Sequence, residues 1–213
     1  MGKPISIGQS HNLISILANN VDWKTVDGEV AQRIIDDPRG AGARFTAFLQ
    51  NGARLIVGGT ISIDRTTPFN PAKFMSTGCS IWRGPAYGNG LEGEEQQCKE
   101  SLALTEVAIA NITLKTCLEG EETPVHGEEF LRRLKRGPSL LLDAKIGQTL
   151  LENPRLIPES WKGTHISLMG TELRHPNGNR CVLYLYWNDG LWGRGYYLLN
   201  HNFNSLSPAA VLG

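Results

Sequence analysis

Two turn dipeptides, Asn177-Gly178 and Asp189-Gly190, constrain the fold of this chain more than any other feature. Both are typical of two-residue type I′ turns, in which successive residues take positive φ angles. They separate three runs, within 164–199, that are rich in aromatic and β-branched residues and therefore favour β-strands. The pattern predicts a three-stranded antiparallel meander with two residues in each turn.

Counting outward from these turns predicts the register of the meander and the face on which each side chain lies. Trp187 should lie opposite Trp192, and Glu172 opposite Leu183. One face is then mixed in character and carries Arg174, Glu172, Leu183, Leu185, Trp187, Trp192, Arg194 and Tyr196. The other is predicted to be core and carries Met169, Thr171, Leu173, Val182, Tyr184, Tyr186 and Tyr197. On this second face, two tyrosine rings should cover the bare backbone of Gly193 and Gly195.

The mixed face is the candidate binding surface. A tryptophan pair with an arginine and a tyrosine beside it is typical of a platform that stacks on a base, a sugar or a partner's side chain. The alternative is that the pair fixes the strand register or packs beneath a helix. The candidate binding residues are Trp187, Trp192, Arg194, Tyr196, Glu172 and, from the preceding loop, Trp82.

The whole chain predicts an α+β fold in three regions. Residues 1–60 form a helical N-terminal region of three short helices and a strand at 53–59, and residues 61–100, rich in Pro and Gly, form a loop-rich connection with one strand near Ser80. Residues 101–213 should contain strands at 101–107 and 112–118, a helix in GEEFLRRLKR, a strand in SLLL and a helix capped by Asp143, then the meander. The three regions are also consistent with one continuous domain.

The central strand of the meander, CVLYLYW, is apolar on both faces. We therefore expect it to be covered on both, either by the two helices of the 101–213 region or by a second copy of the chain.

Charge and hydropathy exclude several classes of function. The 21 basic and 21 acidic residues cancel, and the acidic second N-terminal segment argues against a helix-turn-helix, so nucleic acid is not an expected partner. No apolar run approaches the ~20 residues that cross a bilayer, and the N-terminal residues lack the apolar core of a secretory signal. These observations predict a cytoplasmic protein without a membrane partner.

Neither the cysteines nor the histidines form a ligand or nucleophile signature. Cys79, Cys98, Cys117 and Cys181 are widely spaced and are expected to be free thiols, and the five histidines make no H-x-H or H-x-x-x-H pair. We therefore predict no metal site, no cofactor and no catalytic residue.

Two functions from different classes remain open. The favoured one is a non-enzymatic binding or assembly module that uses the aromatic face, with a protein partner or self-association, and it predicts an exposed aromatic patch without a deep pocket. The alternative is a hydrolase or transferase centred on Glu172 or on a cysteine–histidine pair. It predicts a closed pocket of roughly 300–1,000 Å³ with convergent polar groups.

A set of segments carries a resemblance to a known family. They are SIWRGPA, SLALTEV, GEEFLRRLK, LDAKIGQTLLEN, LIPESWK, GTELRHPNGNRCVLYLYWNDGLW and the closing SPAAVL. Together, over about Asp27 to Leu212, they resemble an uncharacterised protein family that recurs in the genomes of uncultivated candidate-phylum bacteria. The resemblance implies a cytosolic bacterial protein, and it implies no activity, fold or functional residue.

Overall fold

The structure is a computed structural model that describes residues 6–20, 24, 28–39, 42, 45–46 and 59–213. The chain divides into two compact units, 1–55 and 56–213. In the first, helices α1 (Ile7–Asn20) and α2 (Gly28–Asp36) overlap two of the three predicted helical segments. The third helix and the strand at 53–59 lie almost wholly outside the described residues, so the helical character of 1–60 stays a prediction.

The second unit is α+β, as predicted, and is built on one mostly antiparallel sheet. Its main path has the order β4-β11-β7-β8-β9, and two short strands join from the side, β2 to β7 and β6 to β11. The bounds are β2 (Ser80–Ile81), β4 (Ile112–Lys115), β6 (Leu140–Leu141), β7 (Ile166–Arg174), β8 (Arg180–Asn188), β9 (Leu191–Leu198) and β11 (Ala209–Leu212).

Shorter elements surround this sheet. Two small antiparallel pairs join β1 (Thr60–Ser62) to β3 (Glu106–Ala108), and β5 (Val125–His126) to β10 (Asn202–Phe203). The helical turns are α4 (Pro71–Phe74), α5 (Lys99–Leu102), η2 (Ile109–Asn111), η3 (Pro154–Leu156) and η4 (Glu159–Trp161).

The predicted strand at 101–107 is wrong in its first half, because Lys99–Leu102 is helical. In this helical turn Ser101 makes a buried polar contact. Its hydroxyl donates to Asp143 Oδ2 at 2.6 Å and accepts from the Asp143 backbone N–H at 2.9 Å.

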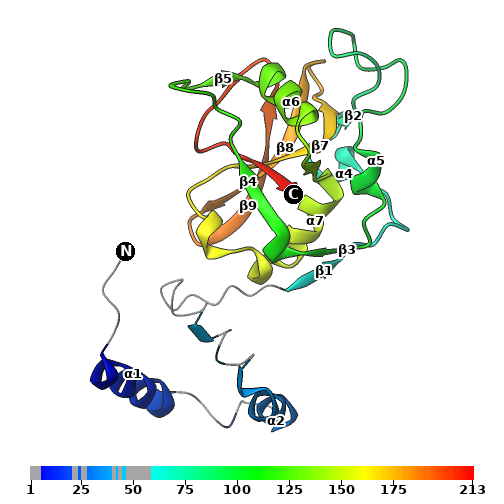
Figure 1. Cartoon of the computed structure of the whole chain (residues 1–213). Coiled ribbons are helices and arrows are strands. Elements are labelled where there is room, and N and C mark those ends of the chain that lie inside the picture. The colour runs from blue at the N-terminus through cyan, green and yellow to red at the C-terminus, as the bar shows by residue number, and fades with distance from the viewer. Residues whose placement is uncertain (1–5, 21–23, 25–27, 40–41, 43–44, 47–58) are drawn as a thin grey trace. The chain divides into compact units, whose positions relative to one another are not determined.

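Two helices cover opposite faces of the sheet, so the prediction that the central strand is covered on both faces is confirmed for Cys181 to Leu183 but not for Tyr184 and Tyr186, which lie outside the α6 core. α7 (Ala144–Glu152) begins at the predicted N-cap, where Asp143 accepts from the N–H groups of Lys145 and Ile146, and it packs against Leu168, Leu183 and Leu185. α6 (Gly127–Arg136) packs on the other face. Figure 1 shows the two helices on either side of the C-terminal strand β11. The alternation of side chains along β8 therefore supplies two separate apolar cores.

The second hairpin has the predicted register. Asp189 and Gly190 both have positive φ, 48° and 84°, as a type I′ turn requires. Trp187 consequently pairs with Trp192, and the pairing runs without a break to Cys181 and Leu198.

The first hairpin does not have the predicted register. Its loop has three residues, Pro176 to Gly178: the His175 N–H donates to the Asn179 carbonyl, the Gly178 N–H donates to the His175 carbonyl, and Gly178 has a φ of 88°. This is a type I turn followed by a left-handed residue. The extra residue shifts the pairing by one position, so Glu172 lies opposite Val182 rather than Leu183 and moves to the α6 face.

A bulge in β7 adds a second irregularity. Leu168 pairs with Leu183 and Glu172 pairs with Val182, which leaves 169–171 without partners on β8. Gly170 instead donates to the Leu142 carbonyl and accepts from the Cys98 N–H. A Cβ at Gly170 would lie 2.7 Å from the backbone carbon of Leu142, so only glycine allows this approach.

Candidate functional site

The predicted tryptophan face, defined as Trp187, Trp192, Arg194 and Tyr196, is assembled by the β8–β9 hairpin. The two tryptophan rings meet edge to face with their centres 5.6 Å apart, and both are half-buried. Trp192 packs against the α7 core. The tryptophan pair therefore contributes both to the core and to the surface.

Groups from elsewhere in the chain occupy much of the tryptophan face. Lys162 Nζ lies 3.6 Å from the centre of the Trp187 ring, and the Arg194 guanidinium lies 4.3 Å from that of Phe74. Tyr196 is 42% exposed and its ring packs against His175. The cation–π contacts that a ligand would make here are thus already made internally.

The other two predicted binding residues, Glu172 and Trp82, lie apart from this face. Both are only 2% exposed, so the prediction that Glu172 shares the mixed face is wrong, for the register reason given above. The Trp82 backbone N–H donates to the Glu172 carbonyl, and the Trp82 indole N–H donates to the Pro85 carbonyl. Trp82 therefore holds its loop against β7 and is not an exposed contact residue.

Glu172 is the centre of a buried ion network between α6 and the hairpin. One carboxylate oxygen accepts from Lys135 Nζ at 2.5 Å, and the other accepts from Arg180 Nε at 2.7 Å and from Arg180 Nη2. Arg180 also donates to Glu128 at the start of α6. Both oxygens of Glu172 are saturated by cations, which suits an anchoring role and not that of a general base.

A cavity of about 650 Å³ lies beside this network, between the end of α6, β6 and the β7 bulge. It falls in the size range that the enzyme alternative predicts, and Glu172, Lys135 and Cys98 line it. No histidine lines it, and Cys98 is paired with Glu100, while burial raises the pKa of its thiol. The described lining thus lacks an activated nucleophile and a free base.

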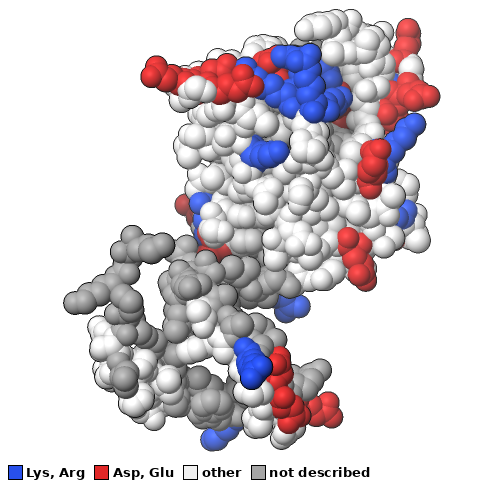
Figure 2. All heavy atoms as spheres, viewed as in Figure 1, with Lys and Arg blue, Asp and Glu red and all other residues white. Residues whose placement is uncertain are grey.

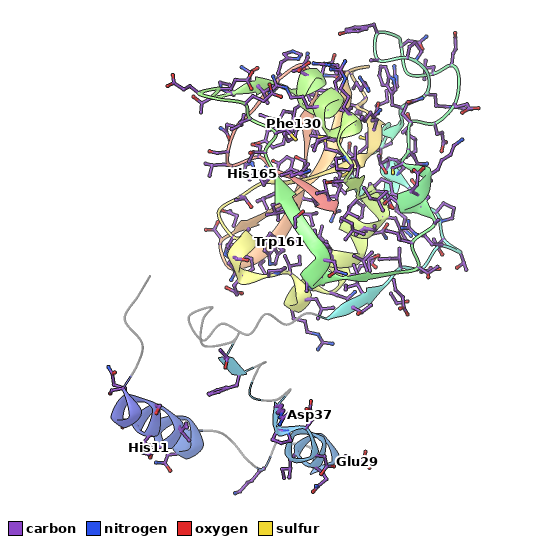
Figure 3. The ribbon with its side chains drawn as sticks, in the orientation of Figure 1. His11, Glu29, Asp37, Phe130, Trp161 and His165 are labelled. Carbon is purple, nitrogen blue, oxygen red and sulfur yellow. The ribbon has the colours of Figure 1, made fainter. Side chains whose placement is uncertain are left out.

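The opposite face of the hairpin carries a cluster of rings that we call the tyrosine face: His165, Tyr184, Tyr186 and Tyr197. His165 stacks on Tyr184 with ring centres 4.9 Å apart, and its Nδ1 lies 2.6 Å from Tyr197 Oη. The Tyr184 ring also contacts those of Tyr186, at 5.7 Å, and Tyr197, at 4.5 Å. In Figure 3 His165 lies between Phe130, on the α6 side, and Trp161.

The tyrosine face only partly matches its prediction as core. Val182 and Met169 belong to the buried α6 cluster and Tyr197 packs against it, whereas Tyr184 and Tyr186 are half-buried and lie outside the cluster. The predicted pairing across glycine is confirmed: a Cβ on Gly195 would lie 2.6 Å from the Tyr184 ring, and one on Gly193 would lie 2.8 Å from the Tyr186 ring. The outer ends of the two tyrosine rings therefore cover the backbone of β9 at these glycines.

Three polar atoms on this face remain available: Tyr184 Oη, Tyr186 Oη and His165 Nε2. The described residues supply no hydrogen-bond partner for them, and they are not among the buried unpaired atoms, so they reach solvent. Burial raises the pKa of Tyr184, as do the neighbouring tyrosines, so its hydroxyl remains a donor at neutral pH. Sequence reasoning missed this site because aromatic residues opposite glycine were assigned to the core.

Charges gather elsewhere on the molecule. Figure 2 shows basic and acidic side chains side by side over α6, where Arg132 and Arg133 pair with Glu129. The one cation in line with the tyrosines along β8, Arg180, is committed to Glu128 and Glu172. None of the four residues of the tyrosine face is Lys, Arg, Asp or Glu.

Within the described ranges, no group of three His, Cys, Asp or Glu side chains is arranged to hold a metal ion. The helices in those ranges are all too short or too polar to cross a membrane. Comparison of the chain with protein-family models, with curated proteins and with solved structures finds no match, so the bacterial family named above stays a prediction from the resemblance.

Proposed function

We propose that the 56–213 unit is a binding module whose tyrosine face takes a neutral, hydroxyl-bearing ring ligand of the carbohydrate class. The observation that carries the proposal is the cluster of rings that covers Gly193 and Gly195, with three polar atoms that have no described hydrogen-bond partner. A sugar ring offers an apolar face for stacking and hydroxyl groups for those atoms. Because none of its four residues is Lys or Arg and nearby Arg180 is paired with Glu128 and Glu172, a phosphorylated ligand is disfavoured relative to a neutral one.

The expected affinity is modest. The Tyr184 ring is already stacked by His165, so the sugar is expected to stack on Tyr186. Stacking on one aromatic ring contributes about 1–3 kcal/mol, and together with two hydrogen bonds it corresponds to a Kd of about 1 mM. An oligosaccharide that stacks on Tyr186 and also reaches Tyr184 Oη and His165 Nε2 should bind more tightly than its monosaccharide.

The test is saturation-transfer NMR with a panel of neutral hexose and pentose oligosaccharides. Tyr186→Ala should abolish the transfer that wild type shows, because Tyr186 lies on the tyrosine face but outside the core cluster. The matched control is Tyr87→Ala, which removes a tyrosine that is 92% exposed and lies near Arg180 at the start of β8, six residues along the strand from Tyr186. Absence of transfer with every saccharide, or equal transfer in Tyr186→Ala, would refute the proposal.

A further inference from the structure

Among the residues that the structure describes, strand β9 is an open edge of the main sheet, since it pairs there with β8 alone. The two-residue turn makes Asn188 and Leu191 a hydrogen-bonded pair, so Trp192, Arg194 and Tyr196 direct their backbone N–H and C=O groups away from β8. Within 59–213 none of these six groups has a hydrogen-bond partner. The edge therefore presents three donors and three acceptors.

This edge lacks the usual protection against pairing. Sheet edges are normally guarded by proline, by a charged side chain, by a bulge or by shortness. β9 has eight residues, no proline and an unbroken register with β8. Its one charge is turned towards α4, because Arg194 Nε donates to the Phe74 carbonyl at 2.5 Å.

We propose that β9 of a second copy of this chain pairs antiparallel with this edge about a two-fold axis. An antiparallel strand is complementary to itself under such a rotation, because its donors and acceptors alternate. A register centred on Gly195 places Arg194 opposite Tyr196 of the second copy, so the two Arg194 cations do not face each other.

The mass of the full chain, measured by sedimentation from low to high micromolar concentration, tests this interface. Wild type should become dimeric as the concentration rises. Tyr196→Pro removes an edge N–H and should weaken the dimer about a hundredfold, because each dimer contains the change twice and each lost hydrogen bond costs about tenfold. Tyr196→Ala keeps the N–H and is the matched control, for which dimerisation should persist.

Hydrogen exchange distinguishes loss of the interface from loss of the fold. The amides of Trp192, Arg194 and Tyr196 should be protected only in the wild-type dimer, whereas those of Val182 and Leu183 should be protected in every variant. A chain that stays monomeric throughout overturns the proposal. So does a dimer that persists in Tyr196→Pro or leaves the edge amides unprotected, since its contact must lie elsewhere.

Discussion

Replacing Glu172 by Gln tests whether the buried ion network holds α6 against the sheet. Gln keeps the shape of the side chain but removes the charge that accepts from Lys135 and Arg180. The two cations then differ in whether water can solvate their charge. The Lys135 side chain is 48% exposed and can turn to water, whereas the Arg180 side chain is 8% exposed and keeps only Glu128.

The size of the effect follows from this difference. Removing one partner of a buried ion pair costs about 3–5 kcal/mol, because the remaining charge is left without compensation. Since Lys135 can be solvated, we expect the lower end, a loss of about 3 kcal/mol in the free energy of unfolding. For a unit of this size such a loss lowers the melting temperature by about 6–12 °C.

Urea unfolding followed by tryptophan fluorescence measures this loss. Glu129→Gln is the matched control on the same helix, because Glu129 and Arg132 are partly exposed and Arg133 keeps its second partner Glu122, so the loss should be smaller than that for Glu172. Equal and small losses in the two variants would show that the Glu172 network is effectively solvated and that α6 is held by its apolar contacts alone.

Three further outcomes follow from buried groups. Gly170→Ala places a Cβ against the Leu142 backbone and should cost at least about 2 kcal/mol in urea unfolding; an unchanged transition midpoint would contradict the close packing. Because the pKa of Tyr184 is raised above its ordinary value of 10.0, the unfolded chain releases this proton first and stability falls as pH rises through 10. In melting curves Tyr184→Phe should reduce this fall of the melting temperature with pH. An identical fall in wild type and variant would contradict the raised pKa. Burial raises the pKa of Cys181 to about 12, so mass spectrometry after thiol labelling of the native protein should find Cys98 and Cys117 modified well before Cys181; early labelling of Cys181 would show that β8 opens locally.

The two turns show how far the sequence could predict this fold. Asp189-Gly190 forms the expected turn, and the hairpin register follows from it by counting. Asn177-Gly178 looks the same, yet Pro176 precedes it. Proline fixes φ near the value that the second position of a type I turn needs, and such a turn requires a third, left-handed residue to restore the strand twist. Reading Pro176 as part of the loop would have placed Glu172 on the correct face.

The candidate sites were less accessible to sequence reasoning, because they depend on segments that are distant in the chain. The tryptophans are correctly placed together, but nothing local indicates that Lys162 and Phe74 reach that face. The pairing of the tyrosines with glycines is predicted correctly. Whether Tyr184 and Tyr186 are buried, however, depends on how much of this face α6 covers, and both lie outside its core. Alternation assigns a side chain to a face of a sheet, and only the packed helices decide which part of the face stays open.

The position of β11 has a consequence for how the sheet can form during synthesis. Residues 209–212 follow β4 and β7 in the chain, yet they occupy the gap between those two strands and supply Ala209, Ala210 and Val211 to the two cores. Until β11 has left the ribosome, β4 lacks its partner in the described sheet and β7 exposes the backbone groups that β11 will take. The hairpins of β7, β8 and β9 can form earlier, whereas β4 can join the sheet only after β11 has been made.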